Sequence, residues 1–264
     1  MPRDRQYFEQ AAAENRLRVL AQPIVSFSRQ SPFLKRYEIL TEIMDAAEPS
    51  QSVSADEWIG AIALHPHNMR QLDFNSVTRA LEQAGDAQFW INVSPLSLQD
   101  IDWLNSAVCA ITSSKLQASQ IVFEVTEHAP IADILPACQT LRELGCGLAL
   151  DDFGAGYASS RKLVELPLTA FKIDQVLCRA AIANSKAYQV LEAFIGMART
   201  MNLELVAEGI ETREQLELLR HLGVQLFQGY ALGIPRALSE TPVRSHLAWP
   251  WSGCIPATTA HSGL

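Results

Sequence analysis

The stretch QIVFEVTEHAPIADILPACQTLRELGCGLALDD, residues 120–152, holds a complete strand–helix–strand pattern. Residues 120–126 and 146–150 are short apolar runs of the kind that form buried strands. Between them, residues 132–145 place an apolar side chain about every 3.6 positions and end at Gly145, which predicts a helix with a glycine stop. The stretch therefore predicts one unit of a parallel sheet.

The same alternation runs through most of the chain. Strand-like apolar runs also occur at 18–25, 35–43, 88–93, 169–173, 203–207 and 224–227. Further helical patterns occupy 56–84, 96–116, 186–201 and 211–222. This alternation predicts an α/β fold, a closed (β/α)8 TIM-like barrel, which usually takes about 250 residues. An open doubly wound sheet is the alternative, although QPIVSFSRQ (22–30) lacks the glycines that such a sheet usually places after its first strand.

Composition narrows the class of protein. The chain has 264 residues, 48% of them hydrophobic, and a formal net charge of −8, which fits a globular protein and argues against binding to duplex nucleic acid. No apolar run is long enough to span a membrane, and the N-terminus lacks the apolar core of a signal peptide, so we expect a cytoplasmic protein. The five cysteines form no C-x-x-C pair and predict reduced thiols rather than a zinc site or a disulfide framework.

Polar residues recur inside or just after the strand candidates, and on almost every strand one lies near the C-terminal end. They are Glu38, Asn92, Glu124, Glu127, Asp151, Asp152, Lys172, Asp174, Glu208, Glu211 and Gln228. In a barrel the C-terminal ends of the strands converge on one face, where active sites lie. The distribution therefore predicts a single ring of side chains drawn from positions far apart in the sequence.

The predicted ring is rich in negative charge. Its crowded carboxylates are Glu38, Glu124, Asp151, Asp152 and Glu208. They would repel one another unless they bound protons or cations. Carboxylate oxygens, together with an asparagine carbonyl, suit Mg²⁺ or Mn²⁺ better than Zn²⁺. Two such ions about 3.5–4 Å apart are the usual apparatus for hydrolysing a phosphodiester.

Lys172, at the end of a strand candidate, permits two interpretations. It could form a Schiff base, as in an aldolase, which requires a depressed pKa. A ring of carboxylates instead raises the pKa of Lys172, so a protonated ammonium would position a water or stabilise a phosphoryl oxygen. Bound metals would offset part of that rise, which leaves the aldolase interpretation open on these residues alone.

A glycine-containing loop, DDFGAGYASS (151–160), follows the fifth strand candidate directly. Gly154 and Gly156 permit backbone angles that other residues avoid. We therefore expect a gating loop that includes Phe153, Gly154 and Gly156.

Seven motifs, in register, resemble the EAL-domain family, bacterial phosphodiesterases that cleave cyclic di-GMP. They are QPIV (22–25), NVSP (92–95), FEVTE (123–127), DDFGAGY (151–157), LPLTAFKID (166–174), AEGIE (207–211) and QGY (228–230). The resemblance implies a barrel whose first strand runs antiparallel to the rest. The resemblance covers about residues 17–240, and we place the catalytic domain at 17–248, after a linker or helix at 1–16. The tail at 249–264 is rich in small and polar residues, which predicts poor order.

The resemblance also implies two ions, Mg²⁺ or Mn²⁺, in one site. Ligands of the first ion would be Glu38, Asn92, Glu124 and Asp151. Ligands of the second would be Asp151, Asp152 and Glu208, with Asp151 bridging. The catalytic set would be Glu38, Asp151, Asp152, Glu208 and Lys172, with Lys172 touching the attacking water.

Further roles follow from the resemblance for residues around the ligand. Those that would contact or line the substrate are Gln22, Leu40, Glu211 and Gln228. Glu127 would anchor the 153–160 loop, which in this family also joins a homodimer interface.

Two residues depart from the family pattern. Ile39 replaces an alanine between Glu38 and Leu40, which exchanges one apolar side chain for another. Glu42 stands where active members usually carry an arginine that contacts the ligand, and a glutamate cannot grip a phosphate or a guanine edge as arginine does. If Glu42 faces the ligand, the expected loss of affinity is roughly ten- to a hundredfold.

The activity implied is hydrolysis of cyclic di-GMP to linear pGpG by two-metal activation of water. The alternative is a catalytically weak or inactive EAL domain that binds cyclic di-GMP, or a protein partner, as a receptor. Every metal ligand of the family pattern that can be placed is present, which favours the enzyme.

Overall fold

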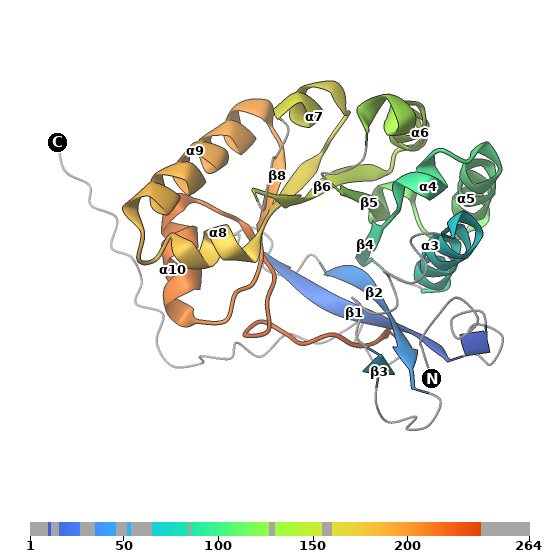
Figure 1. Ribbon diagram of the computed structural model, residues 1–264, viewed down its shortest axis with the longest axis horizontal. Helices are drawn as coiled ribbons and strands as arrows, with labels where there is room; N and C mark the ends of the chain where they lie inside the picture. The colour runs from blue at the N-terminus through green and yellow to red at the C-terminus, as the bar shows by residue number, and fades with distance from the viewer. Residues whose placement is uncertain are drawn as a thin grey trace.

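The computed structural model shows a closed barrel of strands with helices on its outside (Figure 1). The residues that it describes are 10–11, 16–26, 35–45, 52–53, 65–83, 86–126, 130–154 and 160–238.

The barrel closes because β1 pairs with strands at both ends of the row. The order is β1, β9, β8, β7, β6, β5, β4 and β2, and β2 pairs back to β1. The strands are β1 (Leu17–Ser26), β2 (Arg36–Met44), β4 (Gln88–Asn92), β5 (Ile121–Thr126), β6 (Gly147–Phe153), β7 (Ala170–Ile173), β8 (Glu204–Ala207) and β9 (Leu226–Phe227). Neighbours from β2 to β9 are parallel, whereas β1 is antiparallel to both β2 and β9. The predicted barrel with a reversed first strand is confirmed, and the open sheet is excluded.

Short elements and helices complete the described fold. Two further strands extend the sheet at β1 and β2: β10 (Arg236–Ala237) and β3 (Ser52–Val53). The helices are α3 (Pro66–Leu81), α4 (Pro95–Leu98), α5 (Ile101–Ser113), α6 (Ile131–Leu144), α7 (Ser160–Glu165), α8 (Gln175–Ala180), α9 (Ser185–Met201) and α10 (Arg213–Leu222), with a 3-10 turn at Ala118–Gln120.

The prediction of one helix over 96–116 is wrong. Two caps lie close together there: Ser94 accepts a hydrogen bond from the Ser97 amide, and Asp100 accepts one from the Trp103 amide. Each cap starts a helix of its own, because its oxygen satisfies an amide that the helix leaves unpaired. The segment predicted at 56–84 is helical over 66–81, and residues 54–64 lie outside the described part.

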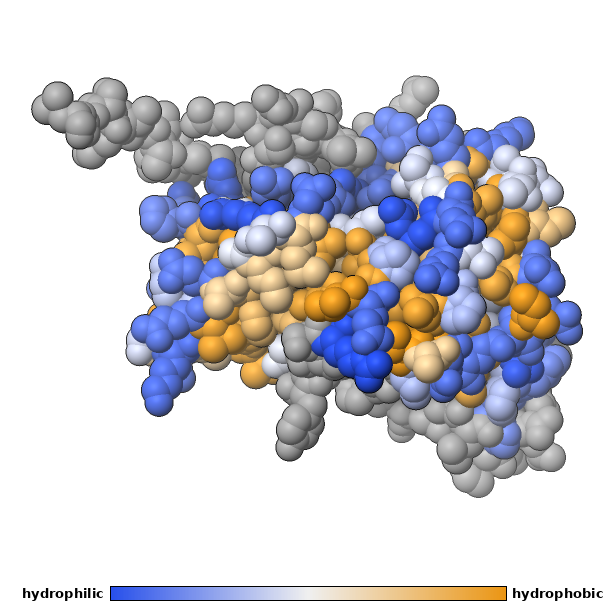
Figure 2. Space-filling view, turned by 90° about the horizontal axis from the view of Figure 1, so that it is seen from above, coloured by the Kyte–Doolittle hydropathy of each residue, from blue (hydrophilic) through white to orange (hydrophobic). Residues whose placement is uncertain are grey.

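The outer surface mixes residue types, and the face in Figure 2 shows hydrophobic residues among hydrophilic ones. Three large apolar side chains that are well exposed are Ile101, Val164 and Val176. No helix in the described ranges combines the length and the apolar character that crossing a membrane requires.

One end of the barrel interior is filled by a layer of mostly aliphatic side chains. They are Ile24, Trp90, Val122, Ala149, Ala170, Val206 and Leu226, all buried. Side chains of alternate residues in a strand point to opposite faces, so the next interior position lies two residues further along. On β5, for example, Val122 faces the barrel interior and Phe123 packs in the outer core, which returns Glu124 to the interior.

Two residues beyond the apolar layer, most strands place a polar side chain in the barrel interior. The pairs are Trp90 and Asn92, Val122 and Glu124, Ala149 and Asp151, Ala170 and Lys172, Val206 and Glu208, and Leu226 and Gln228. On the reversed strand β1 the step runs backwards, from Ile24 to Gln22. The fold therefore builds one polar layer at one end of the barrel.

Asp73 of α3 fixes the segment that follows Asn92. Its buried Oδ2 accepts a hydrogen bond of 2.8 Å from the Ser94 amide and one of 2.6 Å from the Ser97 hydroxyl. Burial raises the pKa of Asp73 to about 6, although the hydrogen bonds from Ser97 and Ser94 oppose that rise. In the folded protein this carboxyl therefore binds its proton more tightly than in the unfolded chain.

We expect the Asp73→Asn variant to lose a pH-dependent contribution to stability. Because the folded pKa is raised, the folded state holds more protons between pH 4 and 6, and this contribution is present at low pH and lost as the pH rises through about 6. Between pH 5 and pH 7.5 the free energy of unfolding of the wild type should fall by about 1 kcal/mol more than that of the variant. Urea denaturation at both pH values measures this. Equal falls in the two proteins would contradict it.

Candidate active site

The centre of the polar layer is the ammonium group of Lys172, which is 1% exposed. Its Nζ lies 2.7 Å from Glu208, 3.0 Å from Glu124, 3.1 Å from Asp151 and 3.5 Å from Glu38. One cation is thus surrounded by acids from four different parts of the barrel. The ring predicted from the strand ends is present as a compact cluster.

The protonation of this cluster is set by burial and by mutual charge. Burial lowers the pKa of Lys172, but the surrounding carboxylates outweigh it and raise the pKa well above its usual range. Burial also raises the pKa of Glu124 strongly, and raises that of Glu208 to about 8, against the attraction of Lys172. A lysine that holds its proton this firmly is a poor Schiff-base nucleophile, which argues against the aldolase interpretation.

Two buried carboxylate oxygens are not satisfied by hydrogen bonds within the described part of the chain. They are Oε1 of Glu124 and Oδ1 of Asp151, although the latter lies within ion-pair distance of Lys172. A buried acceptor without a donor is costly, and a divalent cation is a group that such oxygens bind. The donor set of this layer therefore fits a metal.

A local irregularity of β6 brings two adjacent aspartates to the same site. Successive residues of a regular strand would point to opposite faces. Here the pairing of β6 with β7 shifts between Leu150 and Phe153, and Asp152 has a left-handed φ of 53°. As a result, ligand oxygens of Asp151, Asp152 and Glu208 all lie within 4.8 Å of one another. A non-glycine residue held in this region of φ stores strain, which is common at functional sites.

Amide side chains join the carboxylates on the β1, β2 and β4 side. Asn92 donates to Glu38 over 2.8 Å. Gln228 donates to both Glu38 and Gln22, and Gln22 donates to the carbonyl of Gly233. Four of the residues predicted at the site are therefore connected by direct hydrogen bonds.

Other predicted residues lie at the edge of this cluster or away from it. The side chain of Glu211 is 49% exposed, and its carboxylate forms an ion pair of 2.7 Å with Arg179 of α8. Leu40 lies on β2, two residues beyond Glu38. Phe153 is buried against Phe171, whereas Gly154 has a left-handed φ of 103° that suits a hinge.

Some predictions concern residues outside the described ranges. They are the loop anchor Glu127, the hinge glycine Gly156, and the dimer contact proposed for the 153–160 loop, of which 155–159 are not described. These stay predictions.

One polar contact near the site was not anticipated from the sequence. Glu42 forms an ion pair with Arg18, its cross-strand partner on β1. The pairing depends on the antiparallel register of β1 and β2, for which the sequence offers no direct signal beyond the opposite charges of the two residues.

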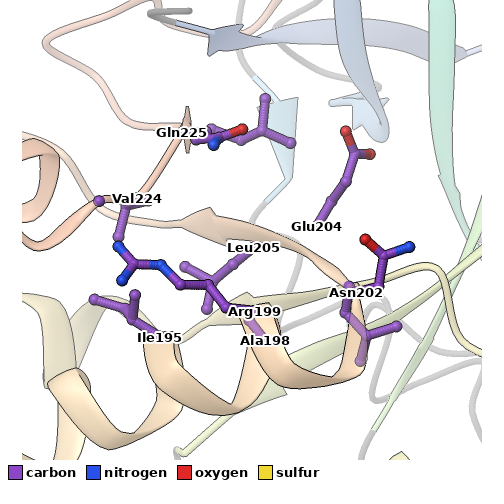
Figure 3. Close-up of a pocket in the computed structure, with 11 residues that line it drawn as sticks. Ile195, Ala198, Arg199, Asn202, Glu204, Leu205, Val224 and Gln225 are labelled. Atoms are coloured by element: carbon purple, nitrogen blue, oxygen red, sulfur yellow. The ribbon is translucent and has the colours of Figure 1, made fainter.

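A cavity of about 340 Å³ lies near the opposite end of β8 from Glu208 (Figure 3). Its lining includes Arg199 and Asn202 at the end of α9, Glu204 at the start of β8, and Gln225 before β9. None of the predicted catalytic or metal-binding residues lines it. The acidic cluster, not this cavity, is the candidate active site.

The sequence matches the EAL domain family over residues 5–235, which is most of the chain. The chain belongs to the EAL domain family. One relative, the cyclic di-GMP phosphodiesterase PdeB of Shewanella oneidensis, is 31% identical over 241 residues, which cover 88% of this chain and 28% of PdeB. The cyclic di-GMP phosphodiesterase PA2567 of Pseudomonas aeruginosa is 38% identical over 148 residues, which cover 55% of this chain and 25% of that relative. The chain thus spans less than a third of either EAL relative.

Solved structures of EAL proteins share the fold. The EAL enzyme Bd1971, in a form with cAMP and cyclic di-GMP bound, is 25% identical with a TM-score of 0.74, and the match covers 89% of this chain and 66% of that one. The EAL domain of FimX from Pseudomonas aeruginosa, bound to cyclic di-GMP, is 22% identical with a TM-score of 0.78, and the match covers 87% and 95% of the two chains. The second likeness bears on the fold alone.

We expect Lys172→Met to destabilise the metal-free protein by about 3–5 kcal/mol at pH 8.5, because removing one partner leaves buried charges without compensation. The loss should be smaller at pH 6, where Glu208 and Glu124, with their raised pKa values, bind protons instead. Urea denaturation in EDTA measures both values, with the exposed Lys186→Met as the control. A loss that is the same at both pH values would show that Lys172 does not balance these acids.

Proposed function

We propose that this chain is a metal-dependent phosphodiesterase that hydrolyses cyclic di-GMP to linear pGpG. The observation that carries the proposal is the buried acidic cluster around Lys172, whose unsatisfied oxygens suit divalent cations. Membership of the EAL domain family, and relatives named cyclic di-GMP phosphodiesterases, supply the substrate. A cytoplasmic location and a homodimer remain predictions.

The residues present would hold two cations, Mg²⁺ or Mn²⁺, side by side. Ligands of one would be Glu38, Asn92, Glu124 and Asp151, and ligands of the other would be Asp151, Asp152 and Glu208. Bound there, the cations would supply positive charge for the phosphoryl oxygens and lower the pKa of the attacking water. The 4.8 Å grouping of Asp151, Asp152 and Glu208 supports the second of these ligand sets.

Lys172 would orient the attacking water through its protonated Nζ, which four carboxylates hold at the centre of the layer. The water oxygen loses a proton as it forms a bond to phosphorus, and the bond from phosphorus to the ribose O3′ breaks. The departing O3′ takes up a proton, which leaves linear pGpG with a 5′-phosphate. Gln22 and Gln228, joined by a hydrogen bond of 3.0 Å, would form the wall of the site beside Glu38.

We expect Glu124→Gln to lower turnover of cyclic di-GMP by at least about a hundredfold, because it removes one negative ligand while keeping the size of the side chain. The assay follows pGpG by chromatography with Mg²⁺ and with Mn²⁺ in separate titrations. Glu217→Gln, an exposed glutamate on α10, is the control and should retain wild-type turnover.

The same assay separates the enzyme from a receptor. Tight binding of cyclic di-GMP by the wild type, with no pGpG formed in either metal, would replace the proposal by the receptor alternative. Full activity of Glu124→Gln would show that the cluster is not the metal site.

A further inference from the structure

The interior faces of β1 and β2 form a ladder of cross-strand pairs that begins inside the barrel. The pairs, from the apolar layer outward, are Ile24–Arg36, Gln22–Glu38, Leu20–Leu40 and Arg18–Glu42. Because every second residue of a strand faces the same way, all four pairs lie on the side of the sheet that carries the acidic cluster. The Arg18–Glu42 pair is the outermost of the four.

The two outer pairs extend past β4 and β9, and only the short strands β10 (at Leu20) and β3 (at Ile43 and Met44) lie beside them. β2 pairs with β4 only over residues 36–39, and β1 pairs with β9 only at Val25 and Ser26. Arg18 is four residues from Gln22, roughly 13 Å along an extended strand. The ribbon of β1 and β2, which Figure 1 shows side by side, therefore forms a wall beside the opening of the site.

The outermost pair holds an arginine in place while leaving it accessible. The guanidinium of Arg18 contacts Oε1 of Glu42 through both Nε and Nη2. The side chain of Arg18 is 51% exposed, whereas that of Glu42 is 17% exposed. An exposed ion pair contributes little to stability, so a contribution to folding does not account for this arrangement well.

We propose that Arg18, held by Glu42, recognises one guanine base of cyclic di-GMP; this inference rests on the proposed function. With a phosphate of the ligand at the level of Glu38, the wall of β1 and β2 lies where the ligand extends out of the barrel. Leu40, which is partly exposed, offers an apolar surface to the base. The guanidinium of Arg18 donates to O6 and N7 of guanine, the geometry in which arginine reads this base.

This proposal gives Glu42 a different role from that of an isolated acid. An isolated carboxylate there would repel an anionic ligand. Because Glu42 is already neutralised by Arg18, its role is to orient the guanidinium, which comes from β1 rather than β2. Arg18 is thus a specificity-determining residue and Glu42 is its positioning residue.

The test compares two substrates in wild type and in Arg18→Ala. For cyclic di-GMP with Mn²⁺, we expect the KM of the variant to rise roughly ten- to a hundredfold, the loss of one charge-assisted contact, with kcat little changed. For bis(p-nitrophenyl) phosphate, a phosphodiester without guanine, the variant should match the wild type. An unchanged KM for cyclic di-GMP, or equal losses with both substrates, would overturn the proposal.

Two further variants test whether the effect of Arg18→Ala comes from a disturbed fold rather than from lost recognition of guanine. Arg79→Ala removes a comparably exposed arginine from an ion pair on α3 and should leave both substrates unaffected. The exchange Arg18→Glu with Glu42→Arg keeps the ion pair and returns a guanidinium to the same rung, so KM should recover to near the wild-type value. A double variant as weak as Arg18→Ala, with a normal melting temperature, would count against recognition by the guanidinium.

The proposed catalytic function and this inference can fail separately. If the wild type hydrolyses neither substrate, the phosphodiesterase proposal fails. Calorimetric binding of cyclic di-GMP in Ca²⁺ then still tests Arg18, because Arg18→Ala should weaken binding by a similar factor.

Discussion

The burial of one ammonium among four carboxylates is the interaction on which the rest of the site depends. Lys172 lies on β7, buried from solvent, and its contacts reach β2, β5, β6 and the residue that follows β8. Without a cation in that position the acids would have to bind protons or move apart. A single charged group therefore allows residues that repel one another to converge on the same end of the barrel.

The barrel supplies this convergence through the alternation of side chains along a strand. The layer of Ile24, Trp90, Val122, Ala149, Ala170, Val206 and Leu226 closes the interior below the site. The next interior position on most strands is also largely buried, and polar side chains are tolerated there because they pair with one another. On the same strands, the residues that pack the core and the residues of the candidate active site thus lie two positions apart.

Much of this could be predicted from the sequence, because most strands show an apolar run with a polar residue inside it or directly after it. Ser94 and Asp100 are residue types that commonly cap helices, but the continuous apolar periodicity of 96–116 predicts a single helix there. The shared direction of Asp151 and Asp152 could not be predicted, since it depends on the bulge in β6 and the left-handed φ of Asp152. The pairs Arg18–Glu42 and Arg179–Glu211 depend on which elements become neighbours in space, and the charges of single residues do not specify that.

The reversed direction of β1 has a mechanical consequence. In the parallel strands from β4 to β9, the chain enters at the closed, apolar end of the barrel and reaches the site towards the end of the strand or just after it. In β1 the chain enters at the open end, so Leu17 and Arg18 come before Gln22, and the apolar layer follows at Ile24. A pull or a rotation applied to the backbone just ahead of Leu17 would therefore act on the rim of the site first, within five residues of Gln22, without passing through the core.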